Sequence, residues 1–228
     1  MRISCGVTPD AVVIQADTVK LKGLLRLPHD AISIVLFAHG SGSGRLSPRN
    51  NFVAERLGEE RTGTLLFDLL TEDEEQVDAL TAELRFDIEL LTARLMAATK
   101  WVLRQECLQA LSVGYFGAST GAAAALSAAA QIPQVTAVVS RGGRPDLAGS
   151  ALSRVRAATL LIVGADDTRV LALNRQALRQ LSCEAQLAVV PGATHLFVEP
   201  GTLEQVASLA SAWFADHARV SRPVTGAK

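Results

Sequence analysis

The sequence is short of cysteine, of net charge and of long apolar runs, and each shortage excludes a class of protein. Its three cysteines (Cys5, Cys107 and Cys183) are odd in number, far apart and without C-x-x-C spacing. We therefore expect thiols in a reducing compartment rather than disulfides or metal ligands. A formal net charge of −1 at pH 7 provides no basic face, which makes nucleic acid and anionic membranes poor partners. No apolar run reaches transmembrane length, and the first residues lack the apolar stretch of a signal peptide. The expected setting is the cytoplasm.

Length and composition suit one α/β domain with a sizeable core. The chain has 228 residues, of which 49% are apolar and 20% charged, a balance typical of globular proteins. Strand-like segments alternate with helix-like segments, which predicts a mostly parallel sheet with helices on both faces. We expect a single domain over residues 1–220 and a polar tail over 221–228, with no internal repeat, linker or separate cap domain.

Apolar runs and apolar periodicity predict the order of the elements. Strands are expected at 10–27 (one or two, with a turn near Asp17), 32–38, 64–70, 110–116, 135–139, 159–163 and 185–190. Helices are expected at 49–61, 81–105, 122–130, 169–181 and 200–217. Ligands of such sheets bind beyond the carboxyl ends of the strands. Without a cap domain, we expect a shallow site at this edge, roofed only by loops.

A G-x-S-x-G pentapeptide, Gly117 to Gly121, stands between an expected strand and an expected helix. A serine at such a turn is lifted out of the backbone with its hydroxyl exposed, and the glycines permit a conformation that a Cβ would obstruct. The N-terminus of the following helix presents unpaired N–H groups to any negative charge that develops there. The same five letters also occur in plain turns. The strand–turn–helix context favours Ser119 as the nucleophile of an acyl transfer.

A serine hydroxyl needs a base to take its proton and a third group to orient that base. Among the four histidines, His195 follows the last expected strand, His29 lies in a loop, and His217 lies late in the final helix. The order nucleophile, acid, base along the chain is that of α/β-hydrolases. His195 stands where this order requires the base.

The acid is expected between the nucleophile and the base. Asp167 directly follows an expected strand and is the preferred candidate. Its neighbour Asp166 suits a helix cap, and Asp146 follows a proline in a segment that also has the pattern of a helix start. The predicted catalytic triad is Ser119, Asp167 and His195, each after its own strand.

Four segments carry a resemblance to a known family. They are His39-Gly-Ser-Gly42, Gly117 to Gly121, Gly164-x-x-Asp167-x-x-Val170 and Pro191-Gly-Ala-Thr-His195-Leu-Phe197, and they span most of residues 30–200. With these motifs the chain resembles the α/β-hydrolase fold and, within it, the dienelactone hydrolase-like group. A narrower resemblance is to the hydrolase segment that some bacterial proteins carry fused to a phosphoribosyltransferase domain. Phe67-Asp-Leu-Leu-Thr71 and Ser140-Arg-Gly-Gly-Arg-Pro-Asp-Leu147 carry it.

The resemblance implies a serine esterase that uses no cofactor and no metal. It also implies an oxyanion hole made of two backbone N–H groups, those of Thr120 and Ser41. Dienelactone hydrolases use a cysteine nucleophile, and this sequence departs from them in carrying Ser119 at the elbow. The expected reaction is the hydrolysis of a small-molecule carboxylic ester, lactone or thioester through an acyl-enzyme.

Three arginines are candidates for reading an anionic group on the substrate. Arg141 and Arg144 lie in a glycine-rich loop at a strand end, and Arg45 follows an earlier glycine-rich loop. A guanidinium group matches a carboxylate or a phosphate well, although a salt bridge or a solvated loop charge would explain the same residues. We add His39, at the end of an inner strand, as a candidate substrate contact. The sequence is compatible with a homo-oligomer but does not indicate one.

Two other classes of function remain open. The segment from Gly40 to Gly44 lies between a strand and a helix, as in a dinucleotide-binding unit, but Arg45 stands where G-x-G-x-x-G requires its third glycine. The second class is a non-catalytic binding protein on a hydrolase fold, because fold does not fix function. The intact triad argues against it. Among enzymes, acyl transfer to an acceptor other than water would use the same three residues.

Overall fold

An eight-stranded sheet forms the centre of the fold. The computed structural model describes residues 6–218, so the predicted tail at 221–228 lies outside the described residues. The strand order is β1-β2-β4-β3-β5-β6-β7-β8. The strands are β1 (Gly6–Ala16), β2 (Val19–Leu27), β3 (Ser33–Ala38), β4 (Thr62–Phe67), β5 (Ser112–Ala118), β6 (Val135–Arg141), β7 (Ala158–Gly164) and β8 (Ala185–Val190). Within residues 6–218 only the β1–β2 and β2–β4 pairs are antiparallel, which confirms the predicted, mostly parallel sheet.

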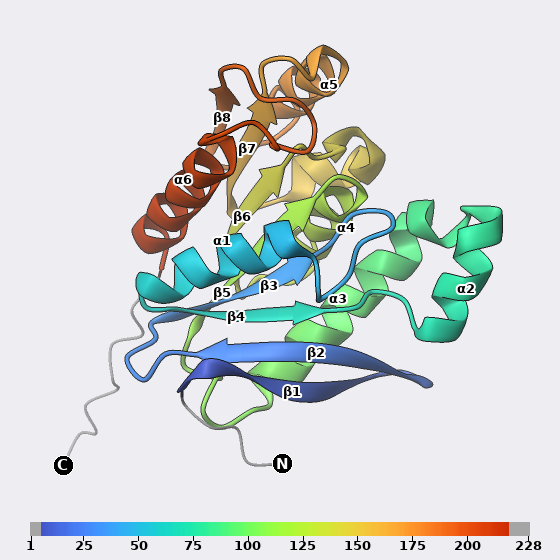
Figure 1. Cartoon of the computed structure of the whole chain (residues 1–228), viewed down its shortest axis with the longest axis vertical. Helices are drawn as coiled ribbons and strands as arrows, with labels where there is room; N and C mark the ends of the chain where they lie inside the picture. Colours follow the sequence, from blue (N-terminus) through green and yellow to red (C-terminus); the bar gives the residue numbers. More distant parts are fainter. Residues whose placement is uncertain (1–5, 219–228) are drawn as a thin grey trace.

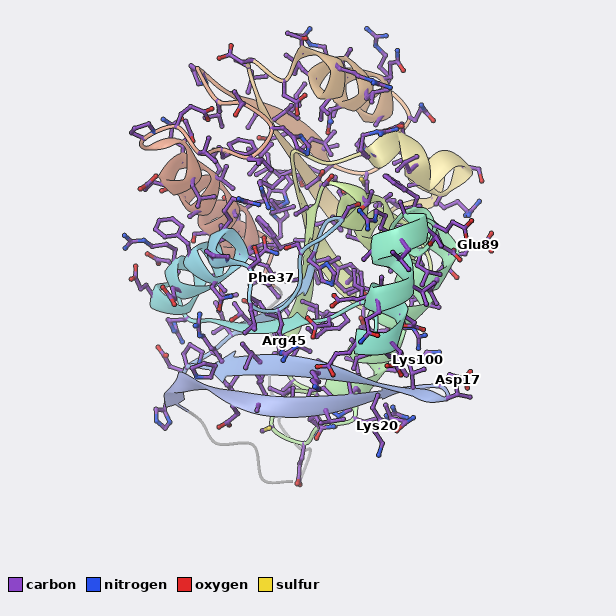
Figure 2. All side chains as sticks on the ribbon, turned by 45° about the vertical axis from the view of Figure 1, so that its right-hand side comes forward. Asp17, Lys20, Phe37, Arg45, Glu89 and Lys100 are labelled. Atoms are coloured by element: carbon purple, nitrogen blue, oxygen red, sulfur yellow. The ribbon has the colours of Figure 1, made fainter. Side chains whose placement is uncertain are left out.

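The expected strand region at 10–27 is a hairpin at one edge of the sheet. Figure 2 shows Asp17 at the tip of this hairpin, where its φ of 53° turns the chain from β1 into β2. At the centre of the sheet, every residue of β3, β4 and β5 is buried. These strands are covered on both faces, which explains why they consist of nearly continuous apolar runs instead of alternating with polar residues.

Helices cover both faces of this sheet (Figure 1). The helices are α1 (Pro48–Glu59), α2 (Glu72–Thr81), α3 (Ile88–Leu103), α4 (Thr120–Ala129), α5 (Thr168–Leu178) and α6 (Thr202–Asp216), with the 3-10 segments η1 (Leu84–Phe86) and η2 (Pro145–Arg154). On one face α1 and α6 bury Leu57 and Trp213 in a core cluster that includes Phe37. On the other face α3 and α4 bury Leu95 and Leu126 in a second cluster. None of the helices within residues 6–218 is long and apolar enough to cross a membrane.

The continuous helix expected at 81–105 was wrong, because the chain turns between two helices. Ala82 adopts a left-handed conformation and ends α2, and the Asp87 side chain accepts a hydrogen bond from Leu90 N–H and so begins α3. The acidic stretch before this break is the first turn of α2. There Thr71 and Glu74 form a reciprocal capping box, and the negative charges face the positive end of the helix dipole.

The strand order creates a crevice at the carboxyl edge of the sheet. The next strand along the chain after β3 is β4, which lies on one side of it, and β5 lies on the other. The loops that leave β3 and β5 therefore diverge, and open α/β sheets bind ligands at such a point. The loops after β6, β7 and β8 emerge from the same edge, because these strands are parallel to β5.

Candidate active site

Ser119 occupies the sharp turn between β5 and α4. Its φ of 51° and ψ of −121° are values that residues with a side chain rarely adopt. The loop after β6 holds this turn on both sides: Ser119 N–H donates to Arg141 O over 3.3 Å, and Arg144 N–H donates to Ser119 O over 3.0 Å. Among the described residues, none forms a hydrogen bond with the Ser119 hydroxyl, which is half-buried in a cavity wall. The strained turn thus presents an uncommitted hydroxyl.

Close packing explains the two glycines of the elbow. A Cβ at Gly117 would collide with Ala122 of α4, and a Cβ at Gly121 would collide with the carbonyl oxygens of Ala38 and His39 at the end of β3. Glycine at both positions lets α4 begin directly against β3 and β5. The first N–H groups of α4, which have no partner inside the helix, consequently lie beside Ser119.

His195 and Asp167 come together from the loops after β8 and β7. Asp167 Oδ2 lies 2.6 Å from His195 Nδ1. The aspartate side chain is 13% exposed and the histidine side chain 40% exposed, so the carboxylate is sheltered while the ring faces the solvent. In the neutral ring this contact places the proton on Nδ1 and leaves Nε2 as an acceptor. The structure therefore brings the predicted acid and base together in the required orientation.

Further hydrogen bonds brace the loop that carries His195. Asp166 N–H donates to Ala193 O over 3.0 Å and so links the loop after β7 to the loop after β8. The backbone N–H and the hydroxyl of Thr194 donate to the carboxylate of Glu199, at 3.1 and 2.6 Å. The hydrogen bond from the Thr194 hydroxyl lowers the pKa of Glu199, which keeps this brace ionised. These hydrogen bonds, which lie before and after His195 in its loop, restrain the position of its backbone.

The backbone N–H groups of Thr120 and Ser41 are the candidates for an oxyanion hole. Thr120 is the first residue of α4, so its N–H has no acceptor within the helix. The loop with Ser41 lies against the nucleophile, because a Cβ built on Gly40 would stand 2.9 Å from Ser119 Cβ. The hydroxyls of Ser41 and Thr120 are 3.3 Å apart, which ties the loop to the helix start. This arrangement is compatible with the oxyanion hole that the resemblance to α/β-hydrolases implies.

Two cavities adjoin at this edge of the sheet. The one that holds Ser119, His195 and Asp167 has a volume of about 510 Å³. A second, of about 660 Å³, extends away from Ser119 to α2. They share the walls formed by the 40–43 loop, Arg49 and Thr120. The smaller cavity contains the candidate triad, and the larger one adjoins it.

A family model matches most of the chain. The model describes the dienelactone hydrolase family and covers residues 61–217, which include the elbow and both loops of the triad. The chain belongs to the dienelactone hydrolase family. This confirms the resemblance that the motifs carry, and with it the α/β-hydrolase fold.

Individual relatives of this family member agree with that assignment. The crystal structure of a dienelactone hydrolase from Anabaena variabilis is 57% identical, with a TM-score of 0.91, over 92% of this chain and 98% of that one. Two Mycobacterium tuberculosis proteins named phosphoribosyl transferase are 56% identical over 91% of this chain. The match covers 46% of their length, so the chain spans about half of these relatives. An esterase domain from a Rhodothermus marinus protein, 17% identical with a TM-score of 0.74 over 92% and 100% of the two chains, shares the fold.

His39, predicted as a substrate contact, lies buried between two backbone groups in this family member. The residue is only 7% exposed, and it lines the larger cavity and not the one that holds Ser119. Nδ1 lies 3.0 Å from Gly40 O, and Nε2 accepts a hydrogen bond from Leu69 N–H over 2.9 Å. Burial lowers the pKa of His39, with a partial offset from the Gly40 hydrogen bond and the charge of Asp68. The neutral ring therefore has no nitrogen left for a substrate and joins the ends of β3 and β4.

Two of the three predicted arginines are committed to carboxylates. Arg45 forms an ion pair with Asp68 and lines only the larger cavity. Arg144 lines the smaller cavity, but its guanidinium group contacts both carboxylate oxygens of Asp146, at 2.7 to 3.2 Å. This contact also occupies Asp146, the alternative candidate for the triad acid.

Arg141 differs from the other two, and it has a neighbour that the sequence analysis missed. Arg141 is 6% exposed, lines the smaller cavity and has no carboxylate partner within residues 6–218. Arg49, on the first turn of α1, lines both cavities. Burial, and then the charge of Arg49, lowers the pKa of Arg141 to about 10. A cation in the first turn of a helix is unfavourable, because it lies at the positive end of the helix dipole. The sequence Ser47-Pro-Arg49 puts Arg49 in such a turn, and this feature could have identified it.

Proposed function

We propose that the chain is a serine hydrolase of small-molecule carboxylic esters, with Ser119 as nucleophile, His195 as general base and Asp167 as the group that orients His195. The observation that carries the proposal is the 2.6 Å contact between Asp167 and His195 in a cavity whose wall also holds the elbow serine. Family membership supports hydrolase chemistry in general. Esters, lactones and thioesters are all substrates to which this triad is suited.

The reaction begins when Ser119 Oγ attacks the substrate carbonyl carbon and its proton passes to His195 Nε2. The carbonyl π electrons move to oxygen, and the resulting oxyanion accepts hydrogen bonds from the N–H groups of Thr120 and Ser41. Asp167 stabilises the imidazolium that forms without taking its proton. Within residues 6–218 no hydrogen bond joins Ser119 to His195, and catalytic hydrogen bonds of this kind often tighten only when substrate binds.

The tetrahedral intermediate then collapses. The bond to the leaving oxygen breaks as that oxygen takes the proton from His195, and an acyl-enzyme remains on Ser119. A water molecule gives its proton to His195 and attacks the acyl carbon. Collapse of this second intermediate returns the proton to Ser119 and releases the carboxylic acid. We place this reaction in the cytoplasm, because the odd number of scattered cysteines suits a reducing compartment.

The test is covalent labelling by a fluorophosphonate, which reacts preferentially with an activated serine. The intact protein, Ser119→Ala and His195→Ala are compared, with Ser208→Ala on the exposed side of α6 as the matched control. We expect the intact protein and the control to be labelled and the two site variants to remain unlabelled. Hydrolysis of short para-nitrophenyl esters should follow the same pattern. Full ester hydrolysis by Ser119→Ala would refute the assignment, and a folded intact protein that never labels would favour a binding role.

A further inference from the structure

Asn174 is a costly residue for its place in the fold. It lies in the interior of α5 and is fully buried, with 0% of its surface exposed. Asparagine is unfavourable inside a helix, because its side chain competes for backbone hydrogen bonds. Its Oδ1 atom is buried and has no hydrogen-bond partner among residues 6–218. A leucine of similar size would avoid both costs if this position served only the core.

The amide nitrogen of Asn174 donates two hydrogen bonds, as many as it has protons. One goes to Val170 O over 2.8 Å, within α5. The other goes to Gly143 O over 3.0 Å, in the loop after β6. Gly143 is itself buried, so its carbonyl depends on the protein for a donor. The second bond therefore explains what the fold gains from an amide at this position.

The peptide unit that Asn174 holds is the one that contacts the candidate nucleophile. The carbonyl of Gly143 and the N–H of Arg144 belong to the same peptide, and this N–H donates to Ser119 O over 3.0 Å. A trans peptide is planar and rigid, and its C=O and N–H groups point in opposite directions. Asn174 and the turn of Ser119 thus lie at the two ends of one rigid unit. Hydrogen bonds linked in such a chain polarise and strengthen one another.

The sheet holds this loop only as far as Gly142. Gly142 N–H donates to Ile162 O of β7 over 2.8 Å, and no backbone bond to β7 follows it within the described part of the loop. Gly142 and Gly143 are consecutive glycines, whose backbone preferences leave the orientation of the next peptide open. The side chain of Asn174 supplies the restraint that the backbone lacks.

The helix that carries Asn174 begins beside the candidate acid. Asp167 is the N-cap residue of α5, and its carbonyl accepts a hydrogen bond from Leu171 N–H over 2.8 Å. Asn174 stands seven residues later, about two turns along the same face of the helix. Asp167 in turn contacts His195 Nδ1 at 2.6 Å. The bond from Asn174 to Gly143 therefore joins the acid and base to the segment that holds the nucleophile.

We propose that Asn174 is a positioning residue of the active site, which holds the turn of Ser119 in place relative to Asp167 and His195 through the Gly143–Arg144 peptide. The inference deepens the proposed function and rests on it. Asn174 lines neither cavity, so it acts through the placement of Ser119 Oγ and not through the substrate. Proton transfer from Ser119 to His195 depends steeply on this placement.

The kinetic test is Asn174→Leu, which removes both donors and the orphaned oxygen but keeps a side chain of similar size. We expect kcat for para-nitrophenyl acetate to fall by roughly 10- to 100-fold, the scale of a misplacement of about 1 Å, with KM within about threefold of the intact value. Fluorophosphonate labelling should slow by a similar factor and still reach the same final extent. A purely structural loss would leave a fraction of chains misfolded, which lowers the extent of labelling and leaves its rate constant unchanged.

The matched control is Gln176→Leu, which replaces an exposed amide on the same helix and should change neither kcat nor the labelling rate. Asn174→Ser is a second variant for the case in which Asn174→Leu does not fold. Its hydroxyl can still bond to Val170 O within the helix, but it is too short to reach Gly143. We expect it to lose activity as Asn174→Leu does. A folded Asn174 variant with unchanged kcat and labelling rate would overturn the proposal.

Amide hydrogen exchange separates this inference from the proposed function. Ser119 N–H donates to Arg141 O, and Arg144 N–H donates to Ser119 O, so the two amides report on the turn without any reaction. Both should exchange several-fold faster in Asn174→Leu than in the intact protein or in Gln176→Leu. Unchanged exchange would overturn the positioning role and leave the triad assignment standing. A folded intact protein that never labels would instead refute the proposed function, and the positioning role with it, even where exchange responds.

Discussion

His39 and His195 both follow strands at the carboxyl edge of the same sheet, and they differ in what their ring nitrogens contact. The nitrogens of His39 are both engaged by the backbone, at Gly40 O and Leu69 N–H, inside a buried environment. His195 has one nitrogen on the carboxylate of Asp167, and its side chain is 40% exposed to a cavity. Both ring nitrogens of His39 are engaged in hydrogen bonds, whereas Nε2 of His195 is available to accept a proton.

This comparison teaches that position at a sheet edge does not by itself make a histidine functional. A buried ring between two backbone groups stabilises the fold in its neutral form. A ring with a carboxylate behind it and open space in front can accept a proton and return it. The two histidines should therefore respond to mutation in opposite ways, one in activity and the other in stability.

The largest effect is expected from Asp167→Asn, which removes the feature that distinguishes His195 from His39. An amide at this position can donate to Nδ1 and so favours the tautomer with a proton on Nε2, which cannot accept the proton of Ser119. We expect kcat for ester hydrolysis to fall by about 10⁴-fold, the scale known for this change in a serine protease triad. The measurement is steady-state kinetics with a para-nitrophenyl ester.

The control for this variant is its thermal stability. Asp167 is largely sheltered but sits in a loop, and asparagine has nearly the same shape, so Tm should change little. A variant that retains its Tm and loses most of its kcat sharpens the distinction between the two histidines. Retention of kcat within a few fold in the folded variant would contradict the role of Asp167 in orienting the base.

The fold was largely predictable because its signals are local. The continuous apolar runs of the inner strands and the change to helical periodicity after them indicated a parallel sheet, and the sheet is confirmed. The error at 81–105 arose because the break before α3 has no clear signal in the sequence. Nothing in the sequence indicates that Ala82 adopts a left-handed conformation. Nothing distinguishes Asp87, which caps the N-terminus of α3, from other exposed aspartates.

The site was predictable only for residues whose role follows from order along the chain. Ser119, Asp167 and His195 each follow a strand in the hydrolase order, and parallel strands bring such ends to one edge. The order of residues along the chain does not show which of Arg45 and Arg49 is paired with a carboxylate. They are four residues apart in the sequence, yet Arg45 pairs with Asp68 after the next strand, whereas Arg49 forms no ion pair within residues 6–218. Charge pairing across a fold depends on contacts that spacing alone does not encode.

The second effect in size is expected from His39→Gln, and it should appear in stability. The substitution removes one or both hydrogen bonds that join Gly40 to Leu69 and leaves buried backbone groups without partners. Such a loss costs about 1–3 kcal/mol of the free energy of unfolding. Chemical denaturation of the intact protein and the variant measures it. We expect kcat to change by only a few fold, and a 10⁴-fold loss of kcat in a stable variant would contradict the structural role.

The smallest effect is a change in how stability depends on pH, and its sign follows from the burial of His39. Burial lowers the pKa of His39 in the folded state, whereas a histidine in the unfolded chain titrates near ~6.5. Below that pH the unfolded state binds more protons than the folded state does, so this contribution to stability is complete above the unfolded pKa and is lost as the pH falls toward the folded pKa. The Tm of the intact protein should therefore fall from about pH 7.5 to about pH 5 more steeply than the Tm of His39→Gln. Other groups titrate alike in both proteins, so the difference between the two curves isolates His39. Parallel curves would mean that His39 is protonated as easily in the fold as in the unfolded chain, and the contrast with His195 would then rest on exposure alone.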